Sequence, residues 1–283
     1  MVEDNNFTIA EAPENHQGKW IDKLVGDPTN QELHDRLDRE QAAYALVEAN
    51  CPDIVPITTE VTGRPERGIR IELLTALGKV TLPEILTVVD RLQDVPVTDD
   101  LPSRDKSFYI PDMRSRLDYL ERLPITAGLT AREARRTMRR AQHHQPAITP
   151  FDTTFVHTDV QKRHFGRSRQ NPVGKLKIFD LDQAHFGNEL EDYAWASVRH
   201  PQYAKAVQEH LRAKFNDNPQ KQANLGEAMD FFYDYFLVKA IYDRSHQAHR
   251  NAFEVVAKAA GRAMLYSPIL RDTAEKIAFV AAD

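Results

Sequence analysis

The chain reads VHTDVQKRHFGRSRQNPVGKLKIFDLDQAHFGNELED over residues 156–192, and this stretch decides its fold. One apolar run leads into Asp159, and a second leads into Asp180. Between them, residues 171–174 (Asn-Pro-Val-Gly) predict a turn, so we expect a hairpin-like excursion that leaves both acids at strand or loop ends. Phosphoryl transfer uses two such carboxylates. One orients the attacking hydroxyl and accepts its proton, and the other holds Mg²⁺ against the phosphates.

The composition is that of a globular protein, with 283 residues of which 41% are hydrophobic and 28% charged. A net charge of -5 argues against a general nucleic-acid binder, which usually carries a basic excess. The one cysteine, Cys51, allows no disulfide and no cysteine zinc site within the chain, which fits a reducing cytoplasm. No apolar run of ~18 residues predicts a membrane span, and the acidic N-terminus is unlike a signal peptide. We therefore expect a cytoplasmic protein without a membrane partner, and the oligomeric state stays open.

The predicted elements change in character along the chain. The first part is expected to hold strands and one helix, over residues 7–25 (a hairpin), 30–50 (the helix, capped by Thr29 or Asn30), 54–61 and 69–74. The remainder is expected to be mostly helical, over residues 82–92, 110–123, 130–144 and from 191 onward, with short strands at 154–156 and 175–179. We therefore expect an α+β protein with a β-rich unit over residues 1–77 and a larger helical unit over residues 78–283.

The stretch 156–192 resembles the aminoglycoside phosphotransferase and choline kinase family, which has a bilobal protein-kinase-like fold. In that family His-Gly-Asp is followed by four residues and Asn, then by an apolar strand ending in Ile-Asp, and later by an Asp that caps a helix. Here His157-Thr158-Asp159, Asp180 and Asp192 stand in those places. The resemblance implies an ATP-dependent small-molecule kinase, with Asp159 as catalytic base and Asp180 as Mg²⁺ ligand. Asp192 and His157 would brace the catalytic loop.

One position departs from the family pattern. The Asn expected five residues after Asp159 is His164. Neutral imidazole can bind a divalent ion, but Mg²⁺ prefers oxygen ligands. Three outcomes stay open: altered metal use, catalysis by a single ion with support from Asp182, or loss of activity. The last outcome would leave a nucleotide-binding or scaffold protein on the same fold.

The resemblance also implies a lysine–glutamate pair near the N-terminus. Kinase-like small lobes hold a lysine on a central strand against a glutamate on the following helix. Lys23 and Glu40 stand in that order, and Lys19 is an alternative because residues four apart on a strand face the same way. The backbone around Leu73 to Thr75 is expected to form the hinge that binds the adenine of ATP.

Two further features have both a functional and an ordinary interpretation. The helix expected over residues 130–144 carries five arginines suited to RNA, although a solvated helix face is the simpler interpretation. Asp230, Tyr233 and Asp234 lie in the C-terminal helical region, where the family places its acceptor-binding wall, and are suited to a cationic substrate. The ordinary interpretation is an aromatic core helix. The hydroxyl acceptor itself stays open, because a fold does not determine a substrate.

Overall fold

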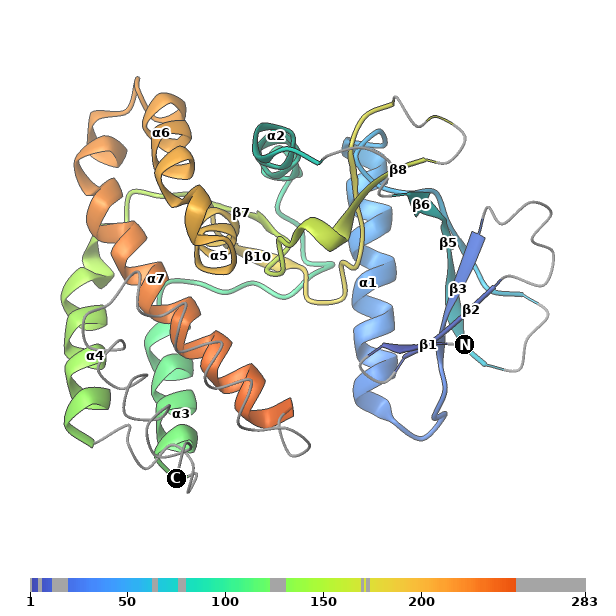
Figure 1. The fold of residues 1–283 in the computed structure, drawn as a ribbon, viewed down its shortest axis with the longest axis horizontal. Helices are drawn as coiled ribbons and strands as arrows, with labels where there is room; N and C mark the ends of the chain where they lie inside the picture. Colours follow the sequence, from blue (N-terminus) through green and yellow to red (C-terminus); the bar gives the residue numbers. More distant parts are fainter. Residues whose placement is uncertain are drawn as a thin grey trace. The chain divides into compact units, whose positions relative to one another are not determined.

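The computed structural model describes residues 2–4, 7–11, 20–62, 66–75, 80–122, 131–168, 171 and 174–247 (Figure 1). The chain divides into two compact units, one of Met1–Ser103 with Thr153–Asp192 and one of Arg104–Asp152 with Tyr193–Asp283. The lobe boundary predicted at residue 77 stays a prediction, because residues 76–79 lie outside the described ranges.

The first unit contains a five-stranded antiparallel sheet with the strand order β1-β2-β3-β5-β4. The strands are β1 (Val2–Asp4), β2 (Phe7–Glu11), β3 (Trp20–Val25), β4 (Thr58–Glu60) and β5 (Gly68–Glu72). β2 and β3 form the predicted hairpin. The strand predicted over residues 54–61 is shorter than expected, because Pro56 has no N–H to give to a sheet. A Cβ at Gly68 would lie 2.5 Å from the carbonyl oxygen of Lys23, so glycine lets β5 approach β3 this closely.

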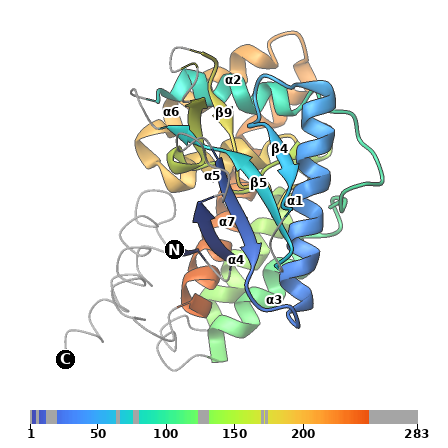
Figure 2. The same cartoon turned by 90° about the vertical axis from the view of Figure 1, so that its right-hand side faces the viewer.

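The helix α1 (Gln31–Asn50) lies along one face of this sheet (Figure 2). Asn30 is its N-cap, as predicted, since the Asn30 side chain accepts a hydrogen bond from the N–H of Leu33. Buried Leu33, Leu37 and Val47 follow helical spacing and face the apolar core. The helix is therefore held at its start by a cap and along its length by burial.

Residues 153–192 belong to the first unit and contain short strands, which pack with one further helix. β7 (Thr153–Val156) pairs with β10 (His185–Asn188), and β8 (Phe165–Ser168) lies between β6 (Leu74–Thr75) and β9 (Lys177–Ile178). The antiparallel β8–β9 pair confirms the predicted hairpin-like excursion. β8 and β10 escaped prediction because both are short and contain glycine, so they depend on their partner strands. The helix α2 (Leu82–Leu92) has its predicted bounds and begins with a capping box of Thr81 and Glu84.

The second unit is helical. Its helices are α3 (Tyr109–Arg122), α4 (Ala131–His144), most of α5 (Glu191–Arg199), α6 (Ala204–Lys214) and α7 (Pro219–Gln247), with 3₁₀ turns η2 (Gln145–Ile148) and η4 (Pro201–Tyr203). α3, α4 and α7 pack on one another (Figure 1). The Tyr109 ring meets Phe231, Phe232 and Tyr235 edge-on. The helices predicted over 110–123 and 130–144 are each confirmed to within one residue at either end. Among the helices that the structure describes, none combines the length and apolar character that a membrane crossing requires.

Candidate active site

The loop after β7 carries Asp159 and is held by Asp192. The backbone N–H groups of His157 and Thr158 donate to the two carboxylate oxygens of Asp192, at 2.9 and 2.8 Å. Asp192 is buried, and burial raises its pKa, against the lowering effect of these bonds and of His157. Both oxygens are thus used to fix the backbone just before Asp159.

His157 joins this loop to the segment that carries Asp180. Its Nδ1 accepts a hydrogen bond from the backbone N–H of Asp159 at 3.0 Å, so the ring proton lies on Nε2. Nε2 then donates to the carbonyl oxygen of Phe179, also at 3.0 Å. The ring is buried, so one neutral imidazole ties the backbones of the two acidic segments together.

Thr158 stands where the family has glycine, and its φ is 66°. The left-handed conformation costs a non-glycine residue about 1–2 kcal/mol, and β-branched residues rarely adopt it. The Thr158 hydroxyl lies 2.5 Å from the carbonyl oxygen of His157 and 3.0 Å from that of Gln183, either of which can accept its proton. These contacts and Asp192 hold the strained turn that presents Asp159.

The carboxylate of Asp159 keeps access to solvent. Gln161 donates an amide hydrogen bond to its Oδ1, while 19% of the side chain is exposed. Arg163 lies 4.0 Å from Oδ2. The hydrogen bond from Gln161 to Oδ1 therefore positions the Asp159 carboxylate. Its solvent-exposed surface can contact a hydroxyl group.

Lys23 lies between two carboxylates. Its Nζ is 2.8 Å from Oε2 of Glu40 and 2.9 Å from Oδ1 of Asp180. Burial alone would lower the pKa of Lys23, but the charges of Glu40, Asp180 and Asp182 hold it well above its usual range. Burial raises the pKa of Glu40 to about 7, against the attraction of Lys23. The predicted pair is thus in contact, whereas the alternative Lys19 lies outside the described residues.

One face of α1 contacts the segment 180–182 at successive turns. Arg36 donates from Nε to Oδ2 of Asp182 at 3.0 Å, and the backbone N–H of Asp180 donates to the Tyr44 hydroxyl at 3.0 Å. Arg36, Glu40 and Tyr44 are spaced by four, which places them on one helix face. Sequence reasoning missed Arg36 and Tyr44, although this spacing around Glu40 was the signal that could have identified them. The carboxylate of Asp182 is engaged by Arg36.

His164 ends the 3₁₀ turn η3 (Lys162–His164) and lies between the two acids. Its Nδ1 is 2.7 Å from the carbonyl oxygen of Asp159, and its Nε2 is 3.5 Å from Oδ2 of Asp180. Burial lowers the pKa of His164, against the effect of Asp159. In the part of the chain that the structure describes, no group of three or more His, Cys, Asp or Glu side chains could hold a metal ion. Any ion held here would complete its coordination with phosphate and water, as Mg²⁺ at nucleotides usually does.

The predicted hinge connects two sheets of the first unit. Leu73 joins β5 to β6, where Leu74 and Thr75 pair with Ser168 and Arg167 of β8. Just before it, buried Glu72 accepts hydrogen bonds from Lys177 (2.9 Å) and from the N–H of Ile57 (3.2 Å). The hinge backbone is therefore fixed from both sides.

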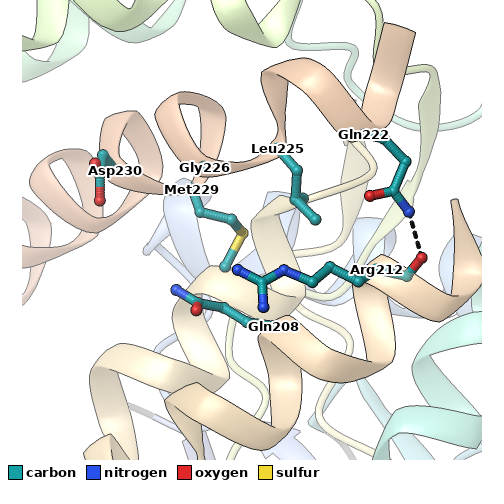
Figure 3. A pocket seen from close by; sticks show the side chains of 7 residues that line it. All are labelled: Gln208, Arg212, Gln222, Leu225, Gly226, Met229 and Asp230. Carbon is teal, nitrogen blue, oxygen red and sulfur yellow. Dashed lines mark hydrogen bonds between the residues drawn. The ribbon is translucent and has the colours of Figure 1, made fainter. Parts of the chain in front are cut away.

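The predicted acceptor-binding residues lie on α7 in the helical unit. Asp234 is buried and accepts hydrogen bonds from Arg140, while Tyr233 is buried and its pKa is raised by burial. Asp230 is exposed and lines a cavity of about 250 Å³ between α6 and α7, together with Arg212, Gln208 and others (Figure 3). Asp234 thus pairs with Arg140 within this unit, and of the three predicted residues only Asp230 lines this cavity.

Replacing Asp192 with asparagine tests the bracing contact. One side-chain N–H of the introduced amide would then face a backbone N–H donor in a buried position, so we expect a loss of about 1–3 kcal/mol in the free energy of unfolding. Urea denaturation measures this loss. Asp217→Asn, at an exposed position, is the control and is expected to change stability by less than about 0.5 kcal/mol. Equal stability of the two variants would contradict the bracing role.

Comparison with known proteins bears on the fold. Neither a protein-family model nor a curated protein sequence matches the chain. Solved structures do match, with TM-scores above 0.5 over most of both chains. They include the GDP and kanamycin complex of APH(2")-IIia, at 12% identity and a TM-score of 0.62, covering 90% of this chain and 93% of that one.

Two other matches come from different groups of proteins. A choline/ethanolamine kinase family protein from Mesorhizobium loti is 14% identical with a TM-score of 0.57, covering 92% of this chain and 87% of that one. The macrolide 2'-phosphotransferase MphH from Brachybacterium faecium is 14% identical with a TM-score of 0.55, covering 94% of this chain and 93% of that one. The predicted α+β, kinase-like fold is confirmed, and the predicted family resemblance is confirmed at the level of the fold.

Proposed function

We propose that the chain is an ATP-dependent phosphotransferase that moves the γ-phosphate to a hydroxyl group of a small molecule. The observation that carries this proposal is the assembly, within one compact unit, of Lys23 against Glu40 and Asp180, with His164 between Asp180 and Asp159. These residues come from separate segments of the sequence. Lysine and glutamate usually lie at the surface, and burying their charges costs free energy. Their burial here in contact with a second carboxylate therefore points to a functional role.

The proposed roles are consistent with the contacts of each residue. Asp159 orients the acceptor hydroxyl and takes its proton through the exposed part of its carboxylate. Lys23, fixed by Glu40, binds the α and β phosphates, and the backbone of Leu73 to Thr75 binds the adenine. These residues act mainly by positioning and by charge, which is how phosphoryl transfer is catalysed in kinase-like enzymes.

The residues also fit a divalent ion. Asp180 offers its Oδ2 and His164 its Nε2, 3.5 Å apart, while Lys23 occupies the other oxygen of Asp180. A bound ion such as Mg²⁺ would neutralise charge on the phosphates. Asp182, which accepts from Arg36, supports this site by fixing α1 against the segment that carries Asp180.

The similar structures support a nucleotide donor and a small acceptor. One is described as a complex with GDP and kanamycin, and another as spectinomycin phosphotransferase in complex with ADP and spectinomycin. Because identity is 11–12%, these names indicate the class of ligand rather than the individual molecule. We therefore propose a nucleoside triphosphate and a hydroxyl-bearing small molecule as ligands, and no nucleic acid or membrane partner.

The test has two steps. First, thermal denaturation is followed with ATP or GTP, each with Mg²⁺ or Co²⁺. We expect stabilisation of about 2.7 kcal/mol at a nucleotide concentration 100 times Kd. Second, transfer of ³²P from the γ-position is measured against aminoglycosides, amino alcohols and sugars. Binding without transfer to any acceptor would favour the alternative, a catalytically impaired nucleotide-binding or scaffold protein. No binding of either nucleotide would overturn the proposal.

A further inference from the structure

The two ring nitrogens of His164 have different partners, which sets the position of the ring proton. Nδ1 lies 2.7 Å from the carbonyl oxygen of Asp159, which can only accept, so Nδ1 carries the proton. Nε2 accepts a hydrogen bond from Nε of Arg163 at 3.0 Å, which requires a lone pair on Nε2. The neutral ring thus directs its lone pair toward a cationic group.

The same nitrogen also lies near a carboxylate. Oδ2 of Asp180 lies 3.5 Å from Nε2 of His164, while Lys23 holds the other oxygen of Asp180. Two acceptor atoms that face each other repel unless a proton or a cation lies between them. Arg163 supplies a cationic N–H at Nε2, but 65% of its side chain is exposed, so it can move away when another cation binds.

The separation of the two acceptor atoms suits a shared metal ion. Ligands about 2.1 Å from one ion lie about 3.0 Å apart at a right angle and about 3.4 Å apart at a tetrahedral angle. The observed 3.5 Å is close to the second value. His164 is also buried, and the bond from Nδ1 to the Asp159 backbone fixes the ring orientation, as outer contacts do for metal-binding histidines.

We infer that His164 makes this site selective for a borderline transition-metal ion, such as Co²⁺ or Zn²⁺, over Mg²⁺. The inference rests on the proposed function for the presence of a nucleotide-bound ion at Asp180. Imidazole suits such ions, whereas Mg²⁺ keeps to oxygen ligands and dehydrates reluctantly. With asparagine at this position the ion would meet an amide oxygen. With histidine it meets nitrogen, so the preference for Mg²⁺ is reversed.

The experiment compares wild type with His164→Asn, both loaded with the ATP analogue that has an imido bridge between the β and γ phosphates. Calorimetry measures the Kd of Co²⁺ and of Mg²⁺ for each protein, so no turnover is required. We expect the ratio of Mg²⁺ Kd to Co²⁺ Kd to fall by about tenfold or more in His164→Asn. Arg163→Gln keeps the imidazole and is the matched control, expected to retain the wild-type ratio. Asp180→Asn is expected to weaken both ions.

Each outcome decides a separate question. An unchanged ratio in His164→Asn would overturn the metal inference, while ³²P transfer with Mg²⁺ would still support the proposed function. A fallen ratio without transfer to any acceptor would support the metal inference and oppose the proposed function. Should His164→Asn fail to fold, pulsed EPR of Mn²⁺ in wild type with ¹⁵N-labelled histidine decides, because a directly bound imidazole gives a ¹⁵N coupling. Absence of that coupling would overturn the inference.

Discussion

Replacing Asp159 with asparagine is expected to lower the rate constant of phosphoryl transfer by about 10²- to 10⁴-fold. An amide oxygen can still orient a hydroxyl group, but it cannot take the proton. The contacts that hold the loop lie on the backbones of residues 157–159 and on Asp192, so the variant should keep the loop conformation. Single-turnover measurements with saturating ATP and acceptor give the rate constant directly.

Two measurements separate this effect from loss of structure. The Kd for ATP and the denaturation midpoint of Asp159→Asn should remain close to wild type, since Asp159 is partly exposed and its proposed partner is the acceptor hydroxyl. Asp94→Asn, another exposed acid of the same unit, controls for the change of charge. A variant that transfers phosphate at the wild-type rate would exclude Asp159 as the base.

Part of residues 156–192 could be predicted because it depends on local sequence. The apolar runs before Asp159 and Asp180 contain β7 and β9, and β9 pairs with β8, the strand that precedes it in the chain. Local periodicity was equally informative for α2, whose apolar positions define both of its ends.

Long-range contacts were harder to predict. Arg36 meets Asp182 across 146 residues, and Tyr44 meets the backbone of Asp180 across 136. No local pattern encodes which helix face will lie against a distant loop, because that depends on how α1 packs on the sheet. Asp182 was predicted to support a single metal ion, whereas its carboxylate lies in an ion pair with Arg36.

The tautomer of His164 also could not be predicted from the sequence. The substitution of histidine for asparagine was visible, but its consequence depends on which nitrogen carries the proton. The Asp159 carbonyl oxygen and the Arg163 guanidinium settle that point through the fold. The sequence left three outcomes open at this position, and our inference about His164 selects altered metal use among them.

Replacing Lys23 with methionine is expected to have the largest effect on stability, a loss of about 3–5 kcal/mol in the free energy of unfolding. Glu40 is fully buried and would lose the cation 2.8 Å from its Oε2. The Kd for ATP should also rise by about 10- to 100-fold, because a charge-assisted contact to phosphate is lost. Urea denaturation and calorimetry measure the two effects. Arg67→Met removes the exposed partner of Asp38 and is the control, with an expected loss below about 1 kcal/mol.

The pH dependence of the stability of Lys23→Met tests whether unpaired Glu40 causes the loss of stability. Burial already raises the pKa of Glu40 to about 7, and without Lys23 its pKa should be higher still. The folded variant then binds a proton that the unfolded chain releases above about pH 4.3, so its stability should fall as the pH rises from about 4.3 through 7. Lys23→Met/Glu40→Leu should lose the part of this slope that comes from Glu40, leaving the part from Asp180, which also loses Lys23. It should recover most of the stability, because neither Lys23 nor Glu40 remains as a buried charge. Its affinity for ATP should stay low. Recovery of ATP binding in the double variant would show that Lys23 serves the stability of this unit and has no part in holding the nucleotide.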